Sequence, residues 1–207
     1  AALDTTGDKN FDRDGYRGTT NSASLRYELN EQLSFKSFIQ YNQYKADIDN
    51  AAFTDDKDHT QKSKNLNTGA GFQFKNKGVS VTGNYMYSES ERNFLNDSGS
   101  INGFAKFVQD DYAGRNQFIE LFATVDLGKG FSLLQGADYR YNTFNNQFLS
   151  VSSFGPFRSQ FNDTSISQQS MYASLFYKGF NDKFNIELGG RLNVNSRYGS
   201  NYTHTFN

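Results

Sequence analysis

Residues 116–142, NQFIELFATVDLGKGFSLLQGADYRYN, contain the pattern that decides the fold. Apolar and polar side chains alternate on both sides of the turn Gly128-Lys129-Gly130. The apolar parity comprises Ile119, Leu121, Ala123, Val125 and Leu127 before the turn and Phe131, Leu133, Ala137, Tyr139 and Tyr141 after it. The other parity carries the charges Glu120, Asp126, Asp138 and Arg140. Period-two alternation around a Gly-rich turn predicts a β-hairpin with one apolar face and one wet face.

The same alternation recurs along the chain and predicts an antiparallel meander. We expect strands at about 18–29, 33–45, 64–75, 79–88, 116–127, 131–142, 168–178 and 183–195. A ninth strand is expected to begin near Tyr202 and to be cut off at Asn207. Lys45, at the end of its strand, carries a charge on an apolar parity. A bilayer enforces such segregation, because an Arg or Lys facing its midplane costs about 2–4 kcal/mol.

The predicted connections alternate between short turns and long loops. Short turns are expected at residues 30–32, 76–78, 128–130 and 179–182, and long loops at 1–17, 46–63, 89–115, 143–167 and 196–201. Short turns at one rim and long loops at the other are typical of outer-membrane barrels. A soluble β-sandwich that binds a ligand such as a carbohydrate is the alternative, and it predicts shorter strands with more frequent turns.

Aromatic residues of the apolar parity gather at the two ends of the strands. The long-loop ends carry Tyr41, Tyr85, Tyr87, Tyr139 and Tyr141, and the short-turn ends carry Phe35, Phe74, Phe131, Tyr177 and Phe184. Two such rows indicate aromatic girdles at the two membrane interfaces. An aromatic-rich soluble core is the other explanation of this pattern.

The composition excludes several classes of protein. Only 36% of the 207 residues are hydrophobic and the mean hydropathy is −0.75, and no run approaches the ~20 apolar residues of a transmembrane helix. A net charge of −1 gives no electrostatic case for nucleic acid, and the absence of cysteine excludes disulfides and thiolate sites. The chain opens without a leader, so we expect either a cleaved leader or an internal piece of a longer protein.

No catalytic constellation is found in the sequence. The two histidines, His59 and His204, have no nucleophile and carboxylate at a suggestive spacing, so the chain is not expected to be an enzyme.

Residues 8–15, DKNFDRDG, place oxygen ligands on alternate positions before a glycine. Ca²⁺ takes six to eight oxygens, and alternating Asp and Asn around a turn can converge on one ion. The segment is not an EF-hand, because Arg13 occupies the glycine position. A second acidic cluster, with Asp47, Asp49, Asp55, Asp56 and Asp58, follows in the next long loop. A bound calcium ion and a solvated acidic surface both remain possible explanations.

The order of these features resembles the TonB-dependent outer-membrane receptors, and within that family most closely the cobalamin receptors. The resemblance depends on residues 12–16 (DRDGY), the strand-to-loop passage 41–58, residues 69–72 (GAGF) and residues 85–88 (YMYS). It depends also on residues 189–193 (GGRLN) followed by 196–199 (SRYG). Single motifs are weakly specific, and their order and spacing give the resemblance its weight.

The resemblance implies an all-β fold, in which residues 1–207 form part of one antiparallel transmembrane barrel domain of about 22 strands that lacks the family's plug. On its own, the piece should be an open curved sheet. The implied localisation is the bacterial outer membrane, and the implied partners are lipid, a small-molecule ligand and the TonB complex. The resemblance maps a structural Ca²⁺ onto Asp12 and Asp14, with Asp58 as a third ligand, and implies no other cofactor.

The function implied is energised uptake of cobalamin or of a siderophore-type ligand. Aromatic residues of the long loops are candidate ligand contacts, with Phe104, Phe107, Tyr112, Phe148 and Phe154 as the first choices and Phe94, Phe144, Phe157 and Phe161 beside them. These rings could instead pack the loops against each other. The alternative function is a complete eight-stranded barrel with a structural, adhesin or narrow-pore role, which the ending Tyr202-x-His204-x-Phe206 favours.

Overall fold

The computed structural model describes residues 14–49, 56, 58–97, 105–181 and 183–207. Within these residues the chain forms nine antiparallel strands in one sheet, and each strand pairs with its neighbours in sequence. The strands are β1 (Tyr16–Glu28), β2 (Leu33–Asp47), β3 (His59–Asn76), β4 (Val79–Asn96), β5 (Ala105–Gly128), β6 (Phe131–Ser152), β7 (Gly155–Gly179), β8 (Phe184–Asn195) and β9 (Gly199–Phe206). The all-β antiparallel meander predicted from the alternation is therefore confirmed.

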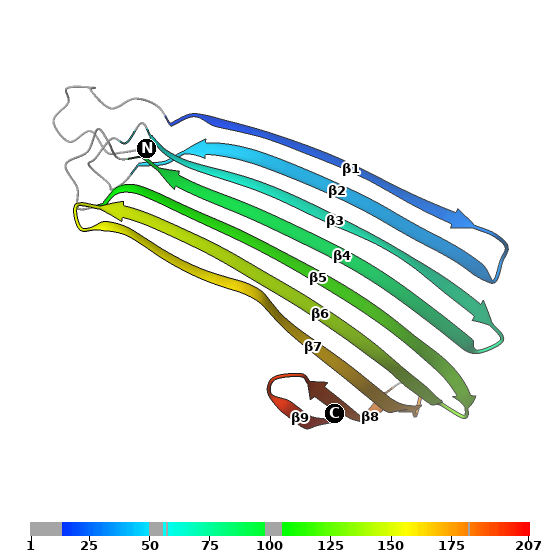
Figure 1. Ribbon diagram of the computed structural model, residues 1–207. Helices are drawn as coiled ribbons and strands as arrows, with labels where there is room; N and C mark the ends of the chain where they lie inside the picture. The colour runs from blue at the N-terminus through cyan, green and yellow to red at the C-terminus, as the bar shows by residue number, and fades with distance from the viewer. Residues whose placement is uncertain (1–13, 50–55, 57, 98–104, 182) are drawn as a thin grey trace.

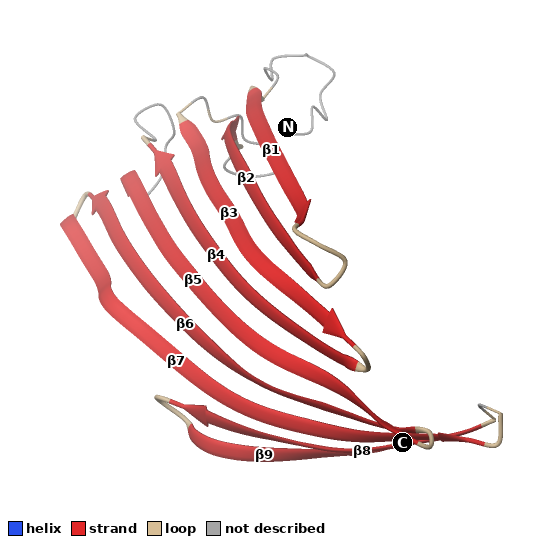
Figure 2. Cartoon of the chain, turned by 90° about the vertical axis from the view of Figure 1, so that its right-hand side faces the viewer, coloured by secondary structure: helices blue, strands red, loops and turns tan. Residues whose placement is uncertain are grey.

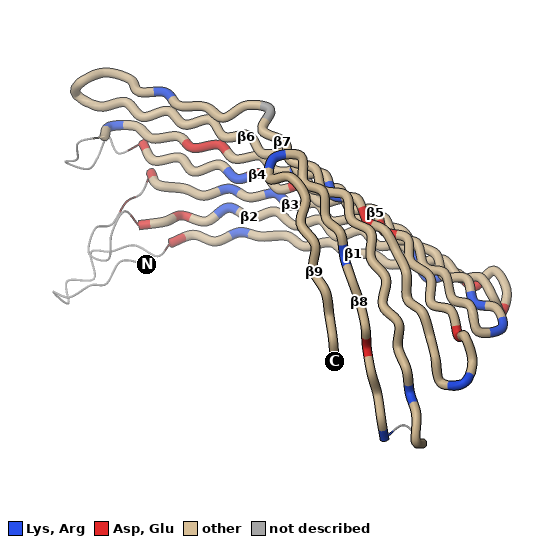
Figure 3. Tube along the Cα trace, turned by 90° about the horizontal axis from the view of Figure 1, so that it is seen from below, with Lys and Arg blue, Asp and Glu red and all other residues tan. Residues whose placement is uncertain are grey.

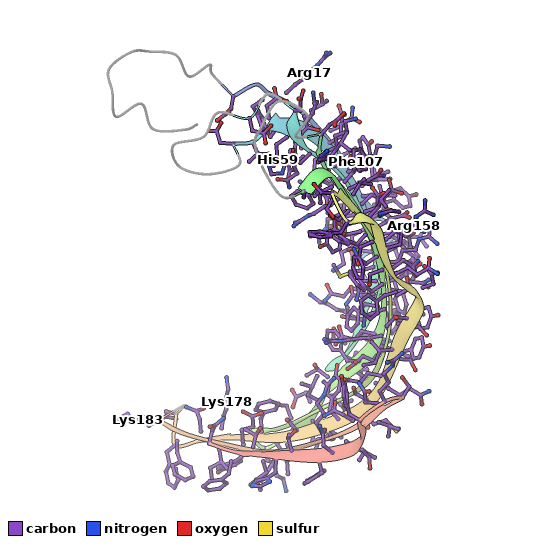
Figure 4. The ribbon with its side chains drawn as sticks, turned by 60° about the vertical axis from the view of Figure 1, so that its left-hand side comes forward. Arg17, His59, Phe107, Arg158, Lys178 and Lys183 are labelled. Carbon is purple, nitrogen blue, oxygen red and sulfur yellow. The ribbon has the colours of Figure 1, made fainter. Side chains whose placement is uncertain are left out.

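The sheet is open and curved, as predicted. Figures 1 and 2 show β1 and β9 at opposite edges of one twisted layer. Figure 4 shows the layer as an arc, with Lys178 on its hollow side and Arg17 and Arg158 directed away from it. No helix long and apolar enough to span a membrane occurs in the described part of the chain.

The strand register places the predicted apolar parities on a single face of the sheet. Leu121 of β5 lies opposite Ala137 of β6, and Ala137 lies opposite Met171 of β7. Met171 in turn lies opposite Leu192 of β8. Lys178 belongs to the other parity of β7, so the polar parity faces the hollow side and the apolar parity forms the convex face. The face assignment made from sequence is confirmed in all eight predicted strands.

Burial is inverted relative to a soluble protein. No hydrophobic residue among those described is buried, and Leu25 and Met171 on the convex face are 65% and 68% exposed. Apart from two glycines, the described residues that are buried are polar, namely Asp56, Ser63, Thr82, Asp138 and Ser170. No second protein layer covers the apolar rows in the described part of the chain, so the soluble β-sandwich is wrong. Lipid is the environment that such an exposed apolar face requires.

The short turns lie where the sequence predicts them. Lys77 and Gly78 have φ of 39° and 84°, and Lys129 and Gly130 have φ of 53° and 84°. Positive φ at successive turn residues matches the right-handed twist of the flanking strands, which is why glycine ends both turns. At the first turn, the Asn30 side chain accepts hydrogen bonds from the backbone N–H of Gln32 and Leu33, each 2.9 Å long.

Most of the predicted long loops are wrong, because the strands continue through them. β4 extends to Asn96 and β5 begins at Ala105, so much of 89–115 is strand. The segment 143–167 is a tight hairpin in which only Ser153 and Phe154 separate β6 from β7. β2 and β3 likewise extend into 46–63, and residues 199–201 already belong to β9. The prediction failed there because polar residues occupy both faces, so the apolar alternation stops although the strands do not.

Along the strands, the convex face changes from apolar to polar at the row of tyrosines that contains Tyr41, Tyr87 and Tyr141. Beyond this row lie residues 16–20, 42–47, 59–65, 88–96, 105–116, 142–152 and 155–166, which we call the outer extension. β5 and β7 have 24 and 25 residues, whereas a strand crosses the bilayer in about 9–11 residues. The outer extension therefore stands outside the hydrocarbon. Lys45 lies in it, which explains why a charge is tolerated on the convex face.

Candidate functional site

The concave face carries a cluster of four charged residues and one tyrosine at the depth of the apolar band. This lumen charge cluster consists of Glu120 of β5, Asp138 and Arg140 of β6, Tyr172 of β7 and Arg191 of β8. The Asp138 side chain is 1% exposed, and Arg191 Nη2 lies 2.5 Å from its Oδ2. Arg140 Nε lies 3.6 Å from Oδ1 of the same carboxylate. The Asp138–Arg191 pair passes over β7, which the curvature of the concave face permits.

Aromatic rings hold the two arginines of the cluster in place. The Arg140 guanidinium lies 4.9 Å from the centre of the Phe118 ring, and the Arg191 guanidinium lies 5.2 Å from that of Tyr172. At these distances the face of a ring attracts a cation. Each arginine is thus bound both to the Asp138 carboxylate and to a ring, which fixes its direction over the sheet.

Gly136 makes room for the second half of the cluster. The Tyr172 hydroxyl donates a 3.0 Å hydrogen bond to Glu120 Oε1 across β6. Gly136 lies between the two strands, and a Cβ there would come within 2.6 Å of Tyr172 Cζ. The missing side chain therefore lets the tyrosine lie flat against the wall and reach Glu120.

The lumen charge cluster gives the wall a fixed, polar surface with charges of both signs. Its members were predicted to face the lumen, because they belong to the polar parity. Their grouping was missed, since it depends on register across four strands, which alternation alone does not reveal.

The concave face of the outer extension carries a group of aromatic rings. This upper aromatic patch comprises Phe94, Tyr112, Phe144, Phe148, Phe157 and Phe161. The ring centres of Phe94 and Tyr112, of Tyr112 and Phe144, and of Phe148 and Phe157 are each 6.2 Å apart. Phe157 and Phe161 are 62% and 60% exposed. The rings contact each other along the wall while leaving apolar surface open to the lumen.

Polar groups are fixed among these rings. The Tyr112 hydroxyl donates to Asp110 Oδ2 at 2.5 Å, and Asn146 Nδ2 donates to Oδ1 of the same carboxylate at 2.5 Å. The hydrogen bond to Asp110 raises the pKa of the Tyr112 phenol above its ordinary value. The patch therefore offers flat apolar surface together with an oriented carboxylate.

The structure separates the predicted ligand residues into different positions. Tyr112 and Phe148 belong to the upper aromatic patch. Phe107 lies opposite Val151 and belongs to the convex parity. Phe154 lies in the turn between β6 and β7 and is 87% exposed, whereas Phe104 lies outside the described residues. Tyr112, Phe148 and Phe107 are strand residues, so their assignment to loops is wrong.

The predicted calcium ligands are only partly described. Asp14 precedes β1 and Asp58 precedes β3 at the same rim, and Asp12 lies outside the described residues. Among the residues that the structure describes, no group of three or more Asp, Glu or His side chains could hold a metal ion. Calcium binding at Asp12, Asp14 and Asp58 stays a prediction.

A curved sheet with an apolar, lipid-facing convex band and a polar concave face is the wall of an outer-membrane β-barrel. A protein-family model described as a putative outer membrane beta-barrel porin, MtrB/PioB, matches residues 13–148. The chain belongs to this family, and its place is the bacterial outer membrane. A search of curated proteins found no significant match.

Solved structures share the fold at low sequence identity. The ferric yersiniabactin uptake receptor FyuA from Yersinia pestis is 11% identical, with a TM-score of 0.70 over 93% of this chain and 33% of that chain. The copper transporter OprC is 13% identical, with a TM-score of 0.66 over 86% of this chain and 28% of that one. The ferric preacinetobactin receptor BauA from Acinetobacter baumannii is 11% identical, with a TM-score of 0.63 over 97% and 38%.

The chain thus spans about a third of the length of these structures. The resemblance to receptor barrels, noted in the sequence, holds at the level of the fold.

Proposed function

We propose that the chain forms consecutive strands in the wall of a larger outer-membrane transport barrel, whose wet lumen admits a ligand with both apolar and polar surface. The observation that carries this proposal is the contrast between the two faces. The convex face is exposed and apolar, and the concave face buries Ser63, Thr82, Asp138 and Ser170. A wall of this kind suits a wide lumen filled with water or with another segment of protein.

The direction of the strands supports a barrel larger than nine strands. In the described meander, β1 and β9 point the same way, because every successive pair is antiparallel. Closing this sheet on itself would require a parallel pair, whereas bacterial single-chain barrels close with an even number of antiparallel strands. This geometry supports a wall completed by further strands and disfavours the complete eight-stranded barrel.

The chemistry of the concave face suggests the class of ligand. The upper aromatic patch suits a flat apolar surface, and the lumen charge cluster suits polar groups at the edge of the same molecule. Metal chelates have both features, and cobalamin is one of them. This class fits a transport role without catalysis, which agrees with membership in a porin family.

Arg140→Gln is expected to shift the permeant-ion preference of the reconstituted barrel toward cations. The substitution removes a lumenal positive charge that lies 3.6 Å from Asp138 and leaves that carboxylate in place. Reversal potentials across a KCl gradient in planar bilayers measure the preference. Arg158→Gln is the matched control, because Arg158 points away from the lumen (Figure 4). Equal reversal potentials for both variants and the wild type would show that this face does not line the conducting path.

Phe148→Ala combined with Phe157→Ala is expected to weaken binding of an aromatic or corrinoid chelate. Stacked aromatic contacts contribute about 0.5–1.5 kcal/mol beyond their buried area, so losing two should lower affinity roughly tenfold. Titrations with ferric catecholate chelates and with cyanocobalamin measure the affinity. Phe107→Ala with Leu149→Ala is the control on the convex parity. Loss of affinity in the control alone would place the ligand elsewhere.

Energised uptake through the TonB complex is the second candidate function, favoured by the shared fold with uptake receptors such as FyuA. It predicts that ligand accumulation in cells stops when a protonophore collapses the proton gradient. A passive porin predicts that accumulation down a gradient continues. The two outcomes separate the candidates without changing the proposed role of the wall.

A further inference from the structure

Three cations lie in a row on the convex face of the outer extension. The register pairs Arg17 of β1 with Lys45 of β2, and Lys45 with Lys62 of β3. A fourth cation, Lys64, is two residues from Lys62 on the same face. Figure 3 shows Lys and Arg segments side by side on neighbouring strands at this end of the sheet.

Like charges in directly opposite positions destabilise a sheet, because their Cβ atoms are only about 4.5–5.5 Å apart. The row therefore lowers the stability of the sheet, and nothing in the fold itself explains why three cations lie in opposite positions. Asp47 partly neutralises Lys45, because Asp47 Oδ1 lies 3.3 Å from Lys45 Nζ. Lys64 lies 4.0 Å from Glu91. Among the described residues, no carboxylate forms an ion pair with Arg17 or Lys62.

On the neighbouring strands β4 and β5, opposite charges on the convex face form an ion pair with each other. Arg115 of β5 donates from Nε to Glu89 of β4 at 2.8 Å, so this cation is neutralised within the sheet. The contrast shows that the outer extension can pair its cations internally. On β1 and β3 it instead presents Arg17 and Lys62, which are exposed and form no ion pair with a described residue.

The height of the row places it beside the lipid headgroups. Lys45 follows Tyr41 of the tyrosine row by four residues on the same face. At about 3.3 Å per residue and a tilt of about 45°, it stands roughly 9 Å above that row along the membrane normal. Lys64 lies two residues nearer the tyrosine row than Lys62 on the same strand. Headgroup layers occupy the first ~5–8 Å beyond the hydrocarbon, and their phosphates lie within reach of Lys and Arg side chains.

We propose that Arg17, Lys45 and Lys62, with Lys64 below them, bind the phosphate groups of lipids in the outer leaflet. The convex position of the row decides in favour of a lipid as the source of phosphate, because the apolar band directly beneath it contacts the acyl chains of the same molecules. Bound phosphate would relieve the repulsion within the row. It would also fix the height at which the outer extension leaves the membrane.

The test compares the full-length protein with a triple variant, Arg17→Gln, Lys45→Gln and Lys62→Gln. A charge-matched control carries Lys75→Gln, Lys129→Gln and Lys178→Gln at the short-turn rim. Each protein is reconstituted in phosphatidylcholine vesicles with or without lipid A, which carries two phosphates. The midpoint of urea unfolding is measured, and lipid A retained by the detergent-purified protein is counted by native mass spectrometry.

We expect the triple variant to bind lipid A roughly 100-fold more weakly than the control, since each basic residue near an anionic surface contributes additively. Its unfolding midpoint should be equal to or above that of the wild type in phosphatidylcholine, whose headgroups carry no net charge, and below it with lipid A. Equal retention of lipid A by the triple variant and the control would overturn the proposal. So would displacement of lipid A by millimolar inorganic phosphate, which would indicate a site for the free anion. If the triple variant does not assemble, the single variant Lys62→Gln must show the same pattern. Its unfolding midpoint should be at or above that of the wild type in phosphatidylcholine and below it with lipid A.

Discussion

Ala123→Arg is expected to lower the free energy of unfolding by about 2–4 kcal/mol in lipid vesicles, because it places a charge at the middle of the lipid-facing band. Ala123 is the central residue of the series Ile119, Leu121, Ala123, Val125 and Leu127 on the convex face of β5. The same change at Ala113, on the same face of the same strand, should cost less than about 1 kcal/mol. Ala113 lies in the outer extension, where the charge meets water.

Urea unfolding of the reconstituted protein measures both variants, and the abundance of each in outer membranes provides a second readout. The two substitutions introduce the same side chain on the same face of the same strand, so differences in strand propensity cancel. Equal costs at the two positions would mean that the tyrosine row does not mark the edge of the hydrocarbon.

Arg191→Met is expected to lower the free energy of unfolding by about 2–3 kcal/mol. Removing one partner of a buried ion pair leaves the other charge uncompensated, at a cost of 3–5 kcal/mol for a fully buried pair. Asp138 is 1% exposed, but Arg191 is 31% exposed and Arg140 stays close to the carboxylate, so the smaller figure applies. Arg197→Met, at an exposed position beyond β8, serves as the control and should change stability little.

The double variant Asp138→Asn with Arg191→Met separates the ion pair from simple loss of packing. If the cost of Arg191→Met comes from the uncompensated carboxylate, adding Asp138→Asn should restore part of the stability. A double variant that is as unstable as the sum of the two single changes would show that the pair contributes no coupling. The lumen charge cluster would then be a set of independent polar side chains.

The fold within the membrane could be predicted from the sequence because lipid imposes a simple rule on it. Only one face may be apolar, so the parity of residues such as Leu25, Leu121 and Leu192 is enough to assign the face of their strands. The turns were equally predictable, since glycine at residues 78 and 130 supplies the positive φ that tight hairpins need.

The outer extension could not be predicted by the same rule. Residues such as Gln109, Asp111, Asn145 and Gln147 form strands outside the hydrocarbon, where both faces are wet and the alternation disappears. They were therefore interpreted as loops. Their strand pairing follows from the hairpin turn at Ser153 and Phe154 and from the ladder below it, which are non-local features.

The candidate site was predicted in part for the same reason. Tyr112 and Phe148 were identified by residue type, but the concave face that unites them with Phe94 and Phe157 depends on register and on the shift between Phe144 and Asn146. Because of that one-residue shift, the residues of β7 beyond it face the opposite side of the sheet, and Phe157 and Phe161 point toward the lumen. A one-residue irregularity of this kind leaves no clear trace in composition.

The most direct test of the central claim is to label successive positions of β5 in turn and measure what each label touches. The 207 residues contain no cysteine, so Leu121→Cys and Phe122→Cys each provide one site in this chain for a nitroxide. In lipid vesicles, the label at residue 121 should collide with oxygen dissolved in the bilayer. The label at residue 122 should collide with a water-soluble nickel chelate, unless a plug covers it. Shielding of residue 121 from lipid oxygen, or the same response at both positions, would contradict a wall with hydrocarbon on one side and the lumen on the other.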